Sequence, residues 1–92
     1  STTKLFSVCS LSADTASALC AEIRTHFAGQ EIKPWGHVAV RMIAASDFTL
    51  DDAQQILSTI HAYCSKDPIW GFESDDQADQ ITIDMLFEMN PL

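Results

Sequence analysis

Residues 49–64 carry apolar side chains at helical spacing, and a helix start signal stands directly before them. Thr49 can accept a hydrogen bond from the backbone N–H three residues on, and Asp52 can answer it as a variant of the capping box. Asp51 and Asp52 also suit the positive end of a helix dipole. The expected buried stripe consists of Ala53, Ile56, Leu57, Ile60 and then Tyr63 or Cys64. This segment is therefore expected to be a helix with one face buried in the fold.

A second helix is expected over residues 13–27, with Ser12 as its N-cap and Gly29 as its stop. Its apolar side chains fall on one stripe, whereas Glu22 and Arg24 lie off that stripe. The stripe consists of Ala16, Leu19, Cys20, Ile23 and Phe27.

Four segments have the residue pattern of strands: residues 4–11, 37–44, 68–72 and 81–89. In the last of them apolar and mostly polar residues alternate, so one face of that strand should be buried and the other mostly wet. The order β-α-β-α-β-β predicts an α/β two-layer sandwich, in which two helices cover a four-stranded mixed sheet. A chain of 92 residues suffices for a single domain of this kind, spanning residues 1–92.

The connections between these segments predict how the strands pair. Each helix should be a right-handed crossover between two parallel strands. The acidic link at residues 73–80 should join the last two strands as a hairpin, which adds antiparallel pairing and makes the sheet mixed. Trp70 lies in an apolar strand and is expected in the core. Trp35 stands in a connector with Pro34 and Gly36, where it either covers the edge of the core or anchors a partner.

The charge balance argues against two classes of partner, nucleic acids and membranes. Five Lys and Arg face thirteen Asp and Glu, for a formal net charge of −8. The cations are scattered singly, whereas nucleic-acid binding needs a basic patch, and an anionic membrane would repel this surface. The acidity serves solubility or offers an acidic face to a basic partner. We therefore expect neither nucleic-acid binding nor membrane insertion.

The cysteines indicate the redox compartment. Cys9, Cys20 and Cys64 are odd in number and widely spaced, which fits reduced thiols in a cytosol better than a secreted disulfide framework. No targeting segment or long apolar run is recognisable, so a cytoplasmic location is expected. The chain starts at Ser1 without Met, and trimming or excision from a longer protein is one interpretation.

Three short motifs, taken in order, resemble the C-terminal domain of FtsZ, the bacterial tubulin-like division protein. Residues 46–53 (SDFTLDDA) are similar to that family's helix start DLTLDEA, and residues 69–71 (IWG) are similar to its strand IIWG. Residues 79–83 (DQITI) are similar to the start of its last strand. The resemblance covers residues 4–87 and implies the fold of that domain together with its protein-interaction surface.

The resemblance does not imply GTP hydrolysis. A nucleotide cradle needs backbone N–H groups that converge on phosphates, but Gly29, Gly36 and Gly71 are single and distant. The family's catalytic loop precedes the region that this chain matches, and its membrane-recruiting tail follows that region. We therefore expect no catalytic residues and no cofactor.

Other candidate chemistry is weak in this sequence. The three cysteines with His26, His37 and His61 lack the close spacing of a zinc site, so no metal is expected. His61 stands three residues before Cys64, and this adjacency alone does not identify a nucleophile. Asp75, Gln77 and Asp79 alternate like the first ligands of a calcium-binding loop, but the central Gly and the distal Glu of such a loop are missing.

These exclusions favour a non-catalytic protein-interaction module that resembles the FtsZ C-terminal domain. Its partner would be a tubulin-like filament subunit in a cell-division assembly, or a second copy of itself in a homo-oligomer. The possible interaction surface consists of Trp35, Asp51, Asp52, Trp70, Glu73, Asp75, Asp76 and Asp79. An alternative is a small oligomeric enzyme or ligand-binding protein of chorismate-mutase-like fold, with basic residues clustered at a site between subunits. A third interpretation is a fragment of a polymer-forming GTPase.

Overall fold

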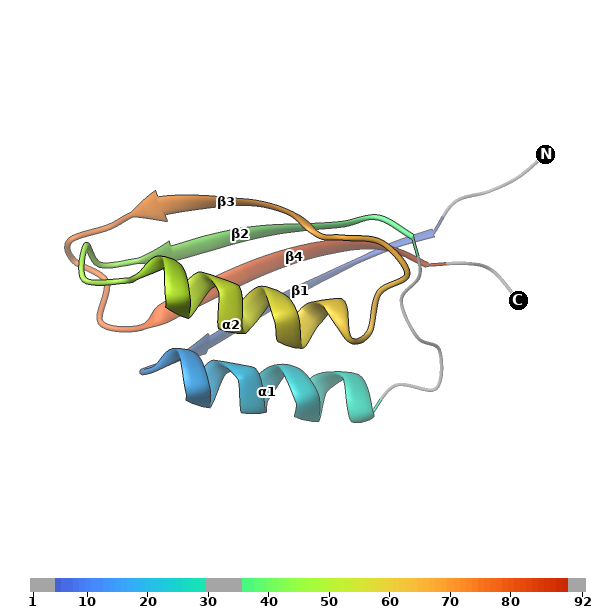
Figure 1. Cartoon of the computed structure of the whole chain (residues 1–92), viewed down its shortest axis with the longest axis horizontal. Helices are drawn as coiled ribbons and strands as arrows, with labels where there is room; N and C mark the ends of the chain where they lie inside the picture. The colour runs from blue at the N-terminus through green and yellow to red at the C-terminus, as the bar shows by residue number, and fades with distance from the viewer. Residues whose placement is uncertain (1–4, 30–35, 90–92) are drawn as a thin grey trace.

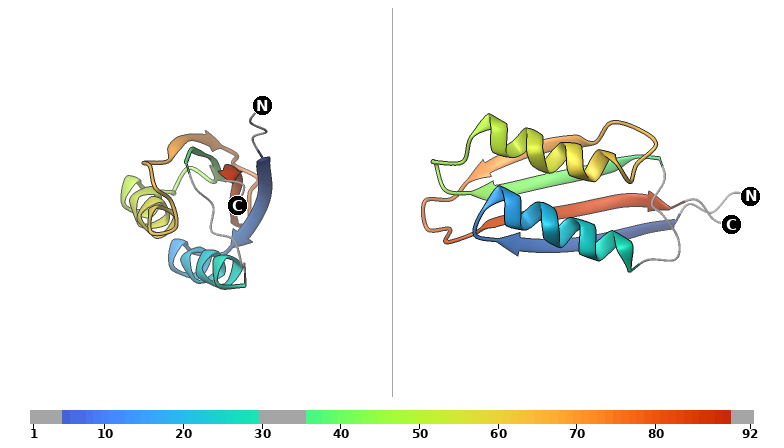
Figure 2. Two further views of the ribbon diagram at one scale, coloured as in Figure 1. Left: turned by 90° about the vertical axis from the view of Figure 1, so that its right-hand side faces the viewer. Right: turned by 60° about the horizontal axis from the view of Figure 1, so that its bottom comes forward.

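Six regular elements follow one another in the order that the residue pattern predicts. The computed structural model describes residues 5–29 and 36–89, and Trp35 lies outside them. The elements are β1 (Leu5–Ala13), α1 (Ala16–Ala28), β2 (Val38–Ala44), α2 (Leu50–His61), β3 (Ile69–Ser74) and β4 (Ile81–Met89). Both helices lie on the same face of one four-stranded sheet (Figures 1 and 2), so the two-layer α/β sandwich is confirmed.

The strand order differs from the one expected. The sheet runs β1-β4-β2-β3, with β4 antiparallel to both β1 and β2, and with β3 parallel to β2. The predicted hairpin of the last two strands is therefore wrong, because β2 lies between them. Parallel pairing across α2 is confirmed, whereas β1 and β2 are separated by β4 and do not pair.

The burial of each strand explains this order. The inward side chains of β4 are Ile83, Met85 and Phe87, and all three are buried, so this strand gains most from a central place. All six residues of β3 are exposed, which suits the edge. Trp70 was expected in the core, but its place on this edge strand leaves it 41% exposed.

The start of α1 lies later than expected. Ser12 does not cap it, because β1 continues to Ala13 and the Ser12 hydroxyl lies 2.8 Å from the Thr82 hydroxyl on β4. Thr15 caps the helix instead, and its Oγ1 accepts from the Ala18 N–H at 3.1 Å. The buried stripe of α1 is the predicted one.

The start of α2 is confirmed in detail. The Asp52 N–H donates to Thr49 Oγ1 at 3.1 Å, and the Thr49 N–H donates to Asp52 Oδ2 at 3.0 Å, which completes the capping box. Ala53, Ile56 and Ile60 are buried as predicted, whereas Leu57 is only half-buried.

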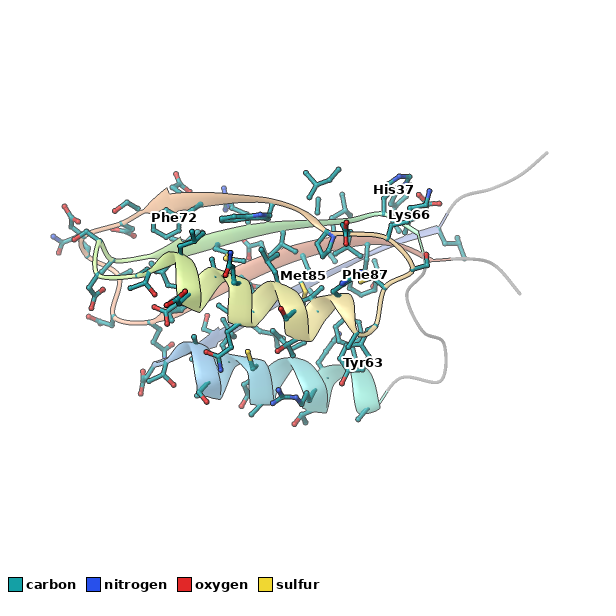
Figure 3. The ribbon with its side chains drawn as sticks, viewed as in Figure 1. His37, Tyr63, Lys66, Phe72, Met85 and Phe87 are labelled. Atoms are coloured by element: carbon teal, nitrogen blue, oxygen red, sulfur yellow. The ribbon has the colours of Figure 1, made fainter. Side chains whose placement is uncertain are left out.

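The core fills the space between the helices and the inner face of the sheet. The rings of Phe27 on α1 and Tyr63 after α2 are stacked with centroids 4.6 Å apart, and Phe27 also contacts Phe87 on β4. Tyr63, Met85 and Phe87 lie between the two layers in Figure 3. Neither helix within the described residues is long and apolar enough to cross a membrane.

Candidate interaction surface

The sheet has one face that no described element covers, and we call it the open face. Alternation along each strand sends the core residues toward the helices and the intervening residues away from them. Large apolar side chains nevertheless point outward here: Phe6 is 58% exposed, Val8 78%, Ile69 67% and Leu86 44%. Large contiguous apolar patches on the surface of a soluble protein are typical of interaction sites.

The strand register joins these side chains into one line across the sheet. Val8 on β1 pairs with Leu86 on β4, Leu86 pairs with Ala39 on β2, and Ala39 pairs with Ile69 on β3. We call these four residues the apolar row. The row exists only because β4 lies between β1 and β2, so the unexpected strand order is what creates the patch.

The neighbouring line across the same face is polar. It consists of Ser10, Asp84, Arg41 and Gly71, paired in the same way across the four strands. The Ser10 hydroxyl donates to Asp84 Oδ1 at 2.8 Å, and Arg41 Nη2 donates to Asp84 Oδ2 at 3.0 Å. Arg41 Nη1 also lies 3.7 Å from Glu73 Oε2. The bonds from Ser10 and then Arg41 hold the pKa of Asp84 below its usual value.

Between these side chains the open face is hollowed. A shallow groove of about 670 Å³ runs over Ala39 and Gly71, bordered by Val8 and Leu86 on one side and by Ile69 on the other. Apart from its two neighbours in sequence, no described residue has an atom within 4 Å of the place where a Cβ on Gly71 would stand. The small size of residue 71 is therefore not required by the packing of its own chain.

The outer edge of β3 is a second exposed feature. No described strand pairs with this edge, and Trp70 and Phe72 stand along it about two-fifths exposed. The ring of Phe72 stacks on Phe48, which precedes α2, with centroids 5.2 Å apart, and Figure 3 shows Phe72 at this position. This stacking fixes one aromatic side chain at the edge.

The residues predicted from the sequence divide between two places. Trp70 and Glu73 lie on β3, whereas the five aspartates belong to the start of α2 and to the link between β3 and β4, which share one end of the molecule (Figure 1). Asp52 is used in the helix cap, and Asp75 Oδ1 accepts from the Gln77 N–H at 3.0 Å in a tight turn. The aspartates are Asp51, Asp52, Asp75, Asp76 and Asp79.

The apolar row escaped the sequence prediction. Leu86 is one apolar residue among the polar residues of the outer side of β4, and Val8 lies in a strand whose two faces are both partly apolar. The available signal was that Phe6 and Val8 lie on one face of β1 and Leu5 and Leu11 on the other, so that both faces carry large apolar side chains.

The thiols and imidazoles of the described residues are engaged separately. Within residues 5–29 and 36–89 no three His, Cys, Asp or Glu side chains are grouped so that they could hold a metal ion. His61 Nε2 lies 3.2 Å from Asp67 Oδ1, and the Cys64 thiol donates instead to the Ile60 carbonyl at 3.3 Å. Burial raises the pKa of the Cys64 and Cys9 thiols, which opposes formation of the nucleophilic thiolate.

Comparison with known proteins shows the fold and no more. No protein-family model matches the sequence, and no curated protein matches it in sequence. The structure is similar to FtsZ from M. jannaschii, with a TM-score of 0.74 and 13% identity over 90% of this chain. A point mutant of that FtsZ gives a TM-score of 0.72 at 12% identity over 89% of this chain.

The fold also occurs outside that protein. Thiamine monophosphate kinase from Aquifex aeolicus gives a TM-score of 0.54 at 8% identity, with 95% of this chain and 33% of the kinase covered. The chain spans 26% of the length of the first FtsZ and 27% of the second. At these identities the chain resembles one part of FtsZ in its fold.

Proposed function

We propose that this chain is a non-catalytic protein-interaction module that acts on or within a tubulin-like cell-division assembly. The observation that carries the proposal is the exposed edge of β3, with two aromatic side chains along it, in a fold similar to part of FtsZ. In the FtsZ family, the helix and strand that resemble α2 and β3 lie near the contact between subunits.

The backbone of β3 supports this role. The Asp75 N–H donates to the Ala44 carbonyl at 2.9 Å, at the end of the parallel pair with β2. Because successive residues direct their backbone groups to alternate sides, those of Trp70 and Phe72 point to the outer edge. Such groups can bind an extended segment of a partner by strand addition, and neighbouring aromatic side chains can anchor it.

Co-sedimentation with polymerised FtsZ tests the proposal. The protein should pellet with the polymer and change its mass. Phe72→Lys should weaken this binding, because a lysine on an edge strand opposes strand addition and the aromatic anchor is lost. Ala21→Lys on the exposed side of α1 adds the same charge away from β3 and serves as the matched control. A protein that stays in the supernatant and leaves the polymer mass unchanged would contradict the proposal.

The alternative of an oligomeric enzyme gains no support from the described cations. It requires basic side chains that converge on a carboxylate substrate. Arg24 lies on α1 and Lys66 follows α2, while Arg41 is already engaged by Asp84 and Glu73. We therefore propose no second function.

A further inference from the structure

We infer that the open face is a docking site for a second copy of this chain, so that two sheets pack face to face about a two-fold axis. The inference goes beyond the proposed function, because it uses the face of the sheet rather than the edge of β3. It rests on the apolar row, the groove beside it and the charges of the polar row.

The apolar row supplies the driving force. Three large side chains of the row, with Phe6 beside them, are left in water by the isolated chain. Sheets that pack face to face bury such side chains at a spacing of about 10 Å, with the strands of the two sheets at about 30°. Covering the row therefore removes the largest group of outward apolar side chains on the described strands from water.

The shape of the face is complementary to itself. Val8 and Leu86 form a ridge, and the groove over Ala39 and Gly71 lies directly beside that ridge. A two-fold axis can place the ridge of each copy in the groove of the other, which is the requirement for an isologous interface. Because Gly71 has open space above it, the partner's side chains can approach the backbone there.

The charges of the polar row fit the same arrangement. Arg41 stands between Asp84 and Glu73, so one small area carries both signs. In a face-to-face pair the two polar rows can lie against each other with the ion pairs of each copy kept, so that no charge is buried without a partner. Each copy also has a net charge of −8, which opposes association at a distance and is screened by salt.

The size of the face sets the expected affinity. Four strands about 4.8 Å apart and about seven residues long form a plane of about 19 by 23 Å. Its flat area is roughly 440 Å², without the additional surface of the side chains. A standard interface buries about 800 Å² on each partner. The dimer should therefore be weak, with a dissociation constant in the micromolar range.

Analytical ultracentrifugation of the whole chain, from about 5 to about 500 μM, tests the inference. The wild-type protein should pass from monomer to dimer within this range, and added salt should strengthen the dimer. The double variant Val8→Thr with Leu86→Thr keeps strand-forming residues and should weaken the dimer at least tenfold. Leu50→Thr removes a leucine that is even more exposed than Leu86 from the start of α2, and it should leave the dimer unchanged.

Gly71→Val separates loss of docking from loss of folding. The new Cβ has open space around it, and valine favours a strand, so the melting temperature should stay the same or rise, while the filled groove should abolish the dimer. A chain that is monomeric at every concentration would overturn the inference. So would a dimer that survives both sets of substitutions, or a monomer whose open face instead binds a basic peptide with an affinity that salt weakens.

Discussion

At the scale of single residues, Asp84 couples the open face to pH. Its carboxylate accepts from Ser10 on β1 and from Arg41 on β2, so it links both neighbours of β4. These bonds hold its pKa below the ordinary value of 3.8. The unfolded chain therefore binds a proton at Asp84 more readily than the folded chain does. The carboxylate stabilises the fold above pH 3.8, and this contribution is lost as the pH falls through the lowered pKa.

Asp84→Asn should therefore lower the free energy of unfolding at pH 7 and have a smaller effect near pH 3. The loss should be modest, because the Asp84 side chain is 40% exposed and solvent screens its ion pair with Arg41. Chemical denaturation at both pH values measures the difference. Asp76→Asn in the exposed link serves as the control. An equal loss at both pH values would show that the charge of Asp84 does not matter.

At the scale of elements, the helices were more predictable than the sheet. The capping box at Thr49 and the stripe of α1 depend on residues within a few positions of one another, so local spacing predicts them. The strand order depends on which strand buries most apolar surface, and the acidic link before β4 does not reveal that the chain crosses β2. Ser12 was misassigned for a similar reason, because its partner Thr82 is distant in sequence.

The apolar row could not be predicted for the same physical cause. Its four residues come from four strands, and only the register brings them into one line. A residue such as Leu86 has no local feature that separates it from an ordinary exposed leucine. By contrast, Trp70 and Glu73 were both named for the candidate surface and both are exposed, although Trp70 was expected in the core and Glu73 in the link after the strand.

Substitutions at two isoleucines compare the stability contributed by the centre of the sheet with that contributed by its edge. Ile83 on β4 is fully buried, whereas Ile69 on β3 is mostly exposed. Ile83→Ala should cost about 2–5 kcal/mol of unfolding free energy, because it leaves a cavity beneath both helices. Ile69→Ala should change it by no more than about 0.5 kcal/mol in the monomer. Equal losses in denaturant titrations at low protein concentration would contradict the order β1-β4-β2-β3.

At the scale of the whole molecule, one layer of helices covers one side of the sheet, and both strands that carry the ends of the described chain lie next to each other. Leu5 on β1 is the register partner of Met89 on β4. Opposite residues of antiparallel strands are about 5 Å apart at their Cα atoms, so a short connection can join these two strands.

A circular permutant follows from this neighbourhood. Residues 1 and 92 can be joined by a Gly/Ser linker, and the chain can be opened at Asp76, in the exposed turn between β3 and β4. The permutant should keep the circular dichroism spectrum of the parent and lose little stability, because the opened turn contributes few contacts. Loss of the helical signal would show that the β3–β4 link is needed for folding.

The adjacency of Leu5 and Met89 also determines where this fold can be inserted in other proteins. A domain whose first and last strands end side by side can be inserted into a surface turn of a host protein without separating the host's strands. Gene fusion could thus place this fold in the middle of another polypeptide as readily as at its tip.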